Sequence, residues 1–157
     1  MEKFLEYLNE AEKIIHTADH LIYMTFPLVR DKKLLLKIIT ETKTAVVNCI
    51  NSILQYEYLY KRIKLYKDPK TNFKTFAEKC AKRYGITREE IESITELFDI
   101  VEKHKQSPFE FMKNDKVVIL SENSSQKVIS VEKTKEFLNI SKNILRKTQN
   151  KILRRGD

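Results

Sequence analysis

The chain of 157 residues contains few of the residues that build tight turns, with only two glycines and three prolines. Many-stranded sandwiches and barrels need such residues at their chain reversals, so the shortage argues against these folds. Cysteine is equally scarce. Cys49 and Cys80 lie far apart without a CxxC neighbour, so we expect two packed thiols and neither a disulfide nor a metal pair.

Long hydrophobic runs are also missing. The longest, at 33–39, is interrupted by Lys37 and falls well short of the roughly 20 residues that a bilayer span needs. We therefore expect no membrane partner. The first residues, MEKFLEYLNEAEK, are acidic and amphipathic, unlike the basic and then apolar start of a signal peptide, so the expected localisation is cytoplasmic.

Signatures of catalysis are absent. There is no GxSxG motif, and two glycines leave no phosphate-binding loop of P-loop or Rossmann type, so we expect no cofactor and no enzyme. His16 and His20 have the spacing of two metal ligands, but no third ligand accompanies them and no metal site is predicted. A ribonuclease with a site assembled from distant residues is a third alternative, with His104 or Glu110 as its positioned group.

The residues that are abundant favour helices. Lys, Glu, Leu and Ile are good or tolerated helix formers, and the length suits one domain. Apolar spacing predicts helices at 4–25, 31–67, 72–84, 87–104, 107–113 and 132–153, and two short β-rich runs at 117–120 and 128–131 predict a hairpin inserted at about 116–131. The predicted fold is all-α, a single bundle of four to five helices with a long central second helix and a small β-hairpin before the last helix.

Capping residues support several of these boundaries. Asp31 is a predicted N-cap, and Thr87 and Glu90 have the spacing of a capping box. Ser107 and Glu110 repeat that spacing and predict the short helix at 107–113. Gly85 is placed to end the third helix in the left-handed conformation.

The second predicted helix carries apolar residues around more than half of its circumference, which is typical of a helix with partners on several sides. If it ran from Asp31 to Lys67 it would be about 55 Å long. We therefore expect it to form the centre of the bundle.

The formal net charge of +8 is unevenly distributed. The range 31–70 holds nine basic and four acidic residues, and the range 132–157 holds eight and three, so each has a net charge of +5. In YEYLYKRIKLYKDPK, the tyrosines at 56, 58, 60 and 66 interleave with basic residues. Rings that stack on bases among cations that neutralise phosphates are typical of single-stranded RNA surfaces. Alternatively, Leu59, Ile63 and Tyr66 share a helical face and simply pack against the bundle.

The last helix carries a polar stripe opposite its apolar face, which predicts phosphate contacts along it, although basic residues there also solubilise the surface and stabilise the helix end. The candidate nucleic-acid-binding residues in both segments are Lys61, Arg62, Lys64, Lys67, Lys135, Lys142, Arg146, Lys147 and Lys151.

These patterns predict a non-enzymatic, cytoplasmic helical binding module that contacts RNA or another polyanion through its basic helix faces. The alternative is a protein–protein adaptor or homo-oligomer. Its contact surface would be the hairpin edge at 117–120 or the uncharged strip formed by Thr44, Asn48, Asn51 and Gln55. A surface rich in Lys and Glu is also typical of proteins from hot environments, which would explain the charge without a ligand.

The segments LQYEYLYKRIKLYKDPKTNF, FAEKCAKRYGIT and HKQSPFEFMKNDKVVIL resemble a group of short, uncharacterised archaeal helical-bundle proteins, which implies no activity. The arrangement of helices is also similar to HEPN-type bundles, a superfamily of RNases and of inactive partners of nucleotidyltransferases. HEPN nucleases carry an Arg followed four to six residues later by His, and no Arg precedes His16, His20 or His104 at that distance. The HEPN-like architecture therefore implies only a non-cleaving, RNA-binding or partner-binding role.

Overall fold

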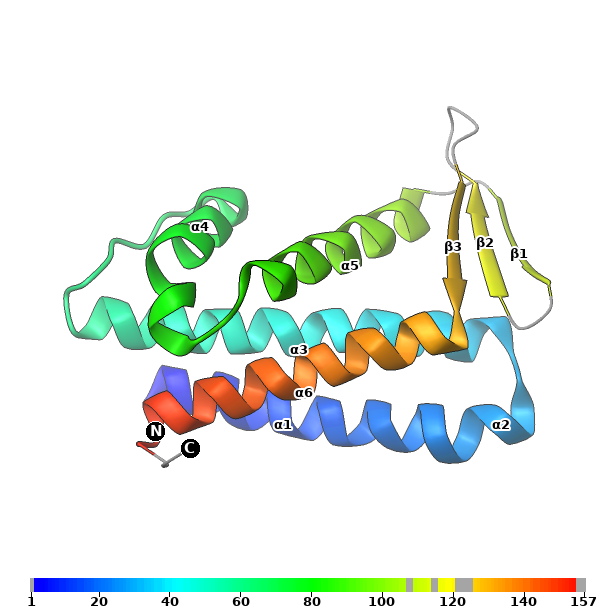
Figure 1. Ribbon diagram of the computed structural model, residues 1–157, viewed down its shortest axis with the longest axis horizontal. Coiled ribbons are helices and arrows are strands. Elements are labelled where there is room, and N and C mark those ends of the chain that lie inside the picture. Colours follow the sequence, from blue (N-terminus) through cyan, green and yellow to red (C-terminus); the bar gives the residue numbers. More distant parts are fainter. Residues whose placement is uncertain (1, 107–108, 114–115, 121–125, 155–157) are drawn as a thin grey trace.

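The computed structural model describes residues 2–106, 109–113, 116–120 and 126–154, and shows a helical bundle with a small sheet at one end (Figure 1). The all-α fold predicted from the sequence is confirmed. Its helical elements are α1 (Lys3–His20), η1 (Leu21–Thr25), α2 (Phe26–Val29), α3 (Lys32–Leu59), α4 (Pro69–Thr75), η2 (Phe76–Cys80), η3 (Ala81–Tyr84), α5 (Arg88–Gln106) and α6 (Val131–Ile152). Within these described helices, none combines the length and apolar character that crossing a bilayer requires.

The long helix α3 lies at the centre of the bundle, as predicted. In Figure 1 it runs between α1 and α6 on one side and α4 and α5 on the other, and it contacts α1, α5, α6 and η2. Leu35, Ile38, Val46 and Ile53 are fully buried along it. Cys49 is buried in the same core as a free thiol, and burial raises its pKa to about 12.

The predicted end of this helix is wrong, because α3 ends at Leu59 and not at Lys67. Lys61 adopts a left-handed conformation with φ 61°. Its N–H donates to the carbonyl of Tyr58 at 2.9 Å, and the N–H of Arg62 donates to the carbonyl of Glu57 at 3.0 Å. This pair of bonds is the Schellman motif that closes a helix, here with lysine in the place where glycine is common. The helix is therefore 28 residues long, about 42 Å.

The first helical segment continues past its predicted end. The π-helical turn η1 lets the N–H of Phe26 donate to the carbonyl of Leu21, and α2 follows with Pro27 in its first turn. Proline has no N–H to donate and clashes with the preceding turn of a regular α-helix. The wider π turn accommodates it, so the chain stays helical to Val29.

The chain from Pro69 to Tyr84 is helical throughout, in three successive geometries. It begins earlier than predicted, with Asp68 as its N-cap. Gly85 ends it at φ 71°, as predicted. The capping box that opens α5 is also confirmed, because Glu90 N–H donates to Thr87 Oγ1 at 3.1 Å and Thr87 N–H donates to Glu90 Oε1 at 3.0 Å.

A three-stranded antiparallel sheet precedes α6, formed in the order β1 (Phe109–Lys113), β2 (Lys116–Leu120) and β3 (Gln126–Ser130). The predicted hairpin is therefore confirmed, but the predicted short helix at 107–113 is wrong over 109–113. Backbone pairing overrides the helical spacing there, because Glu110 lies opposite Ile119 and Met112 opposite Val117. The predicted cap at Ser107 lies outside the described residues.

The sheet also corrects the predicted edge strand. Residues 117–120 belong to β2, which is paired with β1 on one side and β3 on the other. Its backbone groups are already bonded, so β2 offers no edge to a partner. The last helix α6 then begins with Ser130 as N-cap, whose side chain accepts from Lys133 N–H, and buries the predicted inner face, including Phe137 and Ile144.

Candidate nucleic-acid interface

The segment between α3 and α4, residues 60–68, is the candidate interface that the structure defines most clearly. Ile63 and Leu65 pack against the core, whereas Arg62, Lys64 and Tyr66 are exposed. Alternation of this kind is produced by extended backbone and points successive side chains in opposite directions. We call this segment, with the exposed side chains of the helix ends that flank it, the tyrosine–lysine loop; its exposed side chains are Tyr58, Tyr60, Lys61, Arg62, Lys64, Tyr66, Lys67 and Lys70.

The tyrosine rings of the loop are exposed to solvent. Tyr58, Tyr60 and Tyr66 are 52%, 49% and 47% exposed. Tyr56 differs, because it is partly buried and packs against Phe4 with ring centroids 5.1 Å apart. Of the residues in the packing alternative, Ile63 does pack against the core, whereas Leu59 and Tyr66 are exposed. The ring of Tyr60 lies against that of Tyr56, with centroids 4.9 Å apart.

The lysines of the loop are open to solvent, and the charge of one of them, Lys70, helps to lower the pKa of the neighbouring Asp68. Lys61, Lys64, Lys67 and Lys70 are exposed, and within the described part of the chain their side chains form no ion pair. Arg62 is the exception. Its guanidinium lies 5.0 Å from the ring centroid of Tyr60 and pairs with a buried carboxylate described below.

Hydrogen bonds hold the far end of the loop. Asn72 accepts from Tyr66 N–H at 2.9 Å and donates to the carbonyl of Tyr66 at 2.7 Å. Asp68 accepts from Lys70 N–H and from Thr71 Oγ1. The bond from Thr71 is the main reason that the pKa of Asp68 is lowered. These bonds pre-order the backbone, so binding at the loop costs less conformational entropy.

A buried carboxylate anchors the near end of the loop. The side chain of Glu57 is only 2% exposed and pairs with Arg62 at 2.9 Å and with Arg83 at 3.2 Å. Tyr84 donates its hydroxyl to the same carboxylate at 3.2 Å. Burial, followed by the charge of Glu57, raises the pKa of Tyr84 well above its usual range. The network joins α3, the loop and η3.

Sequence reasoning missed Glu57, although a signal was present. It continues the apolar series Ile50, Ile53 and Leu54 at helical spacing, so it occupies a position that faces the core. An acidic residue on such a face is buried only with partners. Arg62 follows Glu57 by only five residues but lies beyond the turn that ends α3, and Arg83 belongs to η3, so neither pairing follows from helical spacing.

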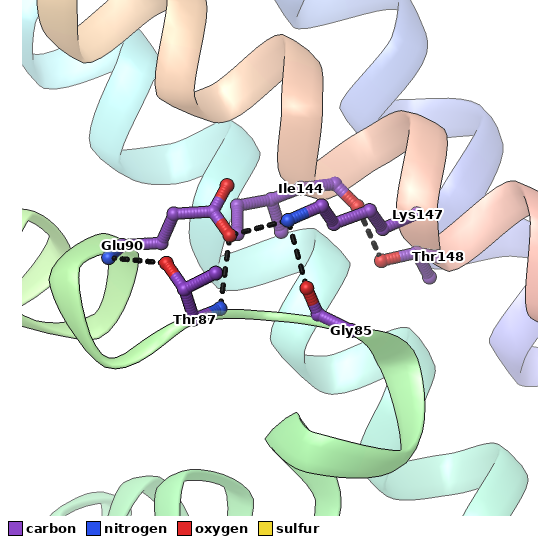
Figure 2. A network of polar contacts seen from close by, with 6 residues as sticks. All are labelled: Gly85, Thr87, Glu90, Ile144, Lys147 and Thr148. Carbon is purple, nitrogen blue, oxygen red and sulfur yellow. Dashed lines mark hydrogen bonds and ion pairs between the residues drawn. The ribbon is translucent and has the colours of Figure 1, made fainter.

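Two of the predicted lysines on α6 bind carboxylates of the bundle itself. Lys142 pairs with Asp19 of α1. Lys147 pairs with Glu90 at 2.5 Å and donates to the carbonyl of Gly85 at 2.8 Å, so it ties α6 to the start of α5 (Figure 2). The side chain of Lys147 is 20% exposed. These contacts give both lysines a structural role.

The other three predicted cations of α6 are dispersed along it. Lys135 lies near the ring of Tyr23, 5.1 Å from its centroid, whereas Arg146 and Lys151 are exposed. Lys135 and Lys151 are separated by about 24 Å along the helix axis. The C-terminal end of α6 lies at the same end of the molecule as the connection between α3 and α4, whereas its N-terminal end adjoins the sheet (Figure 1).

The structure brings together the two residues of the ribonuclease alternative. The Nδ1 atom of His104 contacts the carboxylate of Glu110. Both residues line a cavity of about 370 Å³ whose other lining residues are Lys32, Lys33, Leu36, Lys37, Thr40 and Glu41. His16 and His20 are exposed, and across the described ranges no three His, Cys, Asp or Glu side chains lie close enough to hold a metal ion.

The uncharged strip on α3 bonds largely to its own helix. Thr44 donates to the carbonyl of Thr40, and Asn48 donates to the carbonyl of Thr44. Asn51 lines a separate, mostly apolar cavity.

A scan of protein-family models and a search of curated proteins found no match to the sequence.

Proposed function

We propose that the protein binds single-stranded RNA through the tyrosine–lysine loop. The observation that carries the proposal is the presence of three half-exposed tyrosine rings beside four lysines without an ion-pair partner. An exposed ring offers a stacking face to an unpaired base, and stacking contributes about 1–3 kcal/mol per base. A lysine without a carboxylate partner gains a phosphate without giving up an existing pair.

Single strands fit this surface better than duplexes. Bases in a duplex are already stacked on each other and leave no face for a tyrosine ring. Tyr58 and Tyr66 are the best candidates for stacking, because their rings make no contact with another described aromatic ring. Tyr60 is already covered in part by Arg62 and by Tyr56.

The test is fluorescence anisotropy with a labelled single-stranded RNA, a duplex RNA and a duplex DNA at about 50 and 200 mM salt. We expect the single strand to bind most tightly and its affinity to fall steeply with salt. Replacing Lys64 and Lys67 with glutamine should reduce the slope of log K against log salt by about 1.4, since each phosphate contact contributes about 0.7 for a single strand. Replacing Lys13 and Lys105, which are also exposed, with glutamine is the matched charge control.

A second pair of variants separates stacking from charge. The double exchange Tyr58→Ala and Tyr66→Ala should weaken single-strand binding by about 10-fold or more and leave the salt slope unchanged. Tyr23→Ala is the control, because this ring is also exposed and has Lys135 and Lys142 beside it. If Tyr23→Ala weakened binding as much as the double exchange, the loss would not be specific to the loop, and the interface would be assigned to α6. Absence of salt-dependent binding by the unaltered protein would reject the proposal.

Cleavage of RNA is a second candidate function, favoured by the contact between His104 and Glu110 in a cavity lined by lysines. With Glu110 as the acceptor, the tautomer of His104 that carries its hydrogen on Nδ1 would leave Nε2 to accept a proton. His104 would take the proton of a 2′-hydroxyl as the new O2′–P bond forms and the P–O5′ bond breaks. A lysine ammonium would return a proton to the leaving O5′, giving a 2′,3′-cyclic phosphate.

This candidate has its own test. A labelled RNA is incubated with the protein, with His104→Gln prepared in the same way and with a substrate that carries one 2′-deoxy nucleotide at the cleaved position. Cleavage that ends in a cyclic phosphate and disappears with His104→Gln supports it. Equal cleavage by both preparations indicates a contaminant, and this outcome or no cleavage at all rejects the candidate.

A further inference from the structure

A mostly apolar cavity with a volume of about 560 Å³ is lined by residues of α3, α4 and α5. One wall is formed by Val47, Ile50 and Leu54 of α3. The opposite side holds Phe73 and Phe98, whose ring centroids are 5.4 Å apart. A concave site of this size, walled by apolar and aromatic side chains, is typical of small-molecule binding sites.

The polar residues of this cavity are basic or neutral. Lys43 and Lys70 line it, and among the described residues no aspartate or glutamate does. The ammonium of Lys43 lies 5.9 Å from the ring centroid of Phe98, and within the described residues neither lysine forms an ion pair. The charge of the lining itself is therefore positive, although Asp68 next to Lys70 offsets part of it, and a positive lining complements an anion.

The apolar walls exclude a nucleotide base as the best occupant. A base carries several hydrogen-bonding groups on its edge, and burying them without partners is costly. Asn51 is the one lining amide that makes no hydrogen bond within the described part of the chain, since Asn72 is bonded to Tyr66. A hydrocarbon or aryl body requires no such partners, and one anionic group at the lysines completes the match.

We propose that this cavity binds a small amphipathic carboxylate, with its apolar body between α3 and the two phenylalanines and its carboxylate at Lys43 and Lys70. The proposal does not rest on RNA binding. Lys70 belongs to both sites, so the variants that test the cavity leave it unchanged.

The experiment is isothermal titration calorimetry with decanoate and 2-naphthoate, compared with 1-decanol and 2-naphthol as their uncharged counterparts and with adenosine monophosphate. We expect the carboxylates to bind at least 10-fold more tightly than the alcohols. Lys43→Met, which removes the charge and keeps the length of the side chain, should remove most of this preference. Lys13→Met on α1 is the control and should have no effect.

A second variant tests the location. Val47→Phe fills part of the cavity and should abolish binding of the carboxylates, with a thermal melt of the variant to show that it is folded. If that variant unfolds, chemical shifts of the Asn51 side-chain amide on addition of decanoate to the unaltered protein locate the site instead. Equal binding of acids and alcohols, tight binding of adenosine monophosphate alone, or no binding by any probe would each overturn the proposal.

Discussion

The tyrosine–lysine loop and helix α6 belong to segments of equal net charge, and the structure uses that charge in different ways. On α6, Lys142 and Lys147 pair with Asp19 and Glu90 of neighbouring helices. In the loop, none of the four described lysines has such a partner. The same residue type therefore stabilises the bundle in one region and leaves a positive surface in the other.

The two regions also differ in their aromatic residues and in their anchors. The loop exposes Tyr58, Tyr60 and Tyr66, whereas the apolar side of α6 is buried in the core. The loop is anchored by Glu57, a buried anion that pairs with Arg62 and Arg83. Net charge of a segment is therefore a poor guide to a binding surface until its carboxylate partners are known.

The largest expected effect comes from removing the anchor of the loop. Glu57→Ala leaves Arg62, Arg83 and Tyr84 without their shared acceptor, and we expect the free energy of unfolding to fall by about 3 kcal/mol, as for other broken buried ion pairs. Urea denaturation measures it. A loss below about 1 kcal/mol would show that the network contributes no more than an exposed ion pair.

The pair that joins α6 to α5 should have the next largest effect. Burial opposes the charge of Glu90, but the hydrogen bonds from Lys147 and Thr87 outweigh it, so its pKa is lowered from 4.5. Its stabilising contribution is therefore present above about pH 4.5 and is lost as pH falls through the lower pKa of the folded state. Glu90→Gln keeps the capping bond to Thr87 N–H and should cost about 1–2 kcal/mol at neutral pH.

Unfolding of this variant and of the unaltered protein is then compared at about pH 7 and about pH 3. The difference between them should be smaller at the lower pH, because the carboxyl of Glu90 takes up a proton as pH falls through its lowered pKa, whereas glutamine stays uncharged at both pH values. A difference that stays constant with pH would assign the effect to packing and not to the charge of Glu90.

Much of the fold was predictable because its signals are local. The Asp31 and Thr87 caps, the Gly85 stop and the apolar face of α6 each depend on residues within a few positions of one another. The end of α3 was not predictable in this way. YEYLYKRIKLYK keeps helical spacing through Lys67, and the Schellman turn at Lys61 uses a residue that seldom adopts positive φ.

The candidate site was predictable only in composition. The order of tyrosines and lysines indicated a basic aromatic segment, but its exposure depends on where α3 ends. The pairing of Lys142 with Asp19 and of Lys147 with Glu90 depends on how α6 packs against α1 and α5, which no local pattern encodes. Strand β1 was missed for the same reason, since it is defined by pairing with β2.

Lys61 offers a sharper contrast, because its change should stabilise the protein. Its φ of 61° costs a residue with a side chain about 1 kcal/mol. Lys61→Gly should therefore raise the free energy of unfolding by about 0.5–1 kcal/mol, and it should also weaken RNA binding because it removes a cation of the loop. Gly85→Ala is the reverse control. No atom lies within 4 Å of the added Cβ there, so its expected loss of about 1 kcal/mol reports backbone strain alone. A destabilised Lys61→Gly protein would show that this lysine side chain supports the fold.

The exchanges with the smallest expected effects on stability test the comparison between the loop and α6 most directly, because one should destabilise the fold and the other should stabilise it. Lys142→Gln removes the partner of Asp19 and should cost up to about 0.5 kcal/mol, the usual contribution of an exposed ion pair. Exchanging Lys64 and Lys67 for glutamine should instead stabilise the fold slightly, since these cations have no partner and the chain carries a net charge of +8. Both effects should shrink in about 1 M salt, where charges are screened within about 3 Å. If both exchanges lowered the free energy of unfolding, the loop lysines would also form favourable charge interactions within the fold. A phosphate could then bind them only in competition with those interactions.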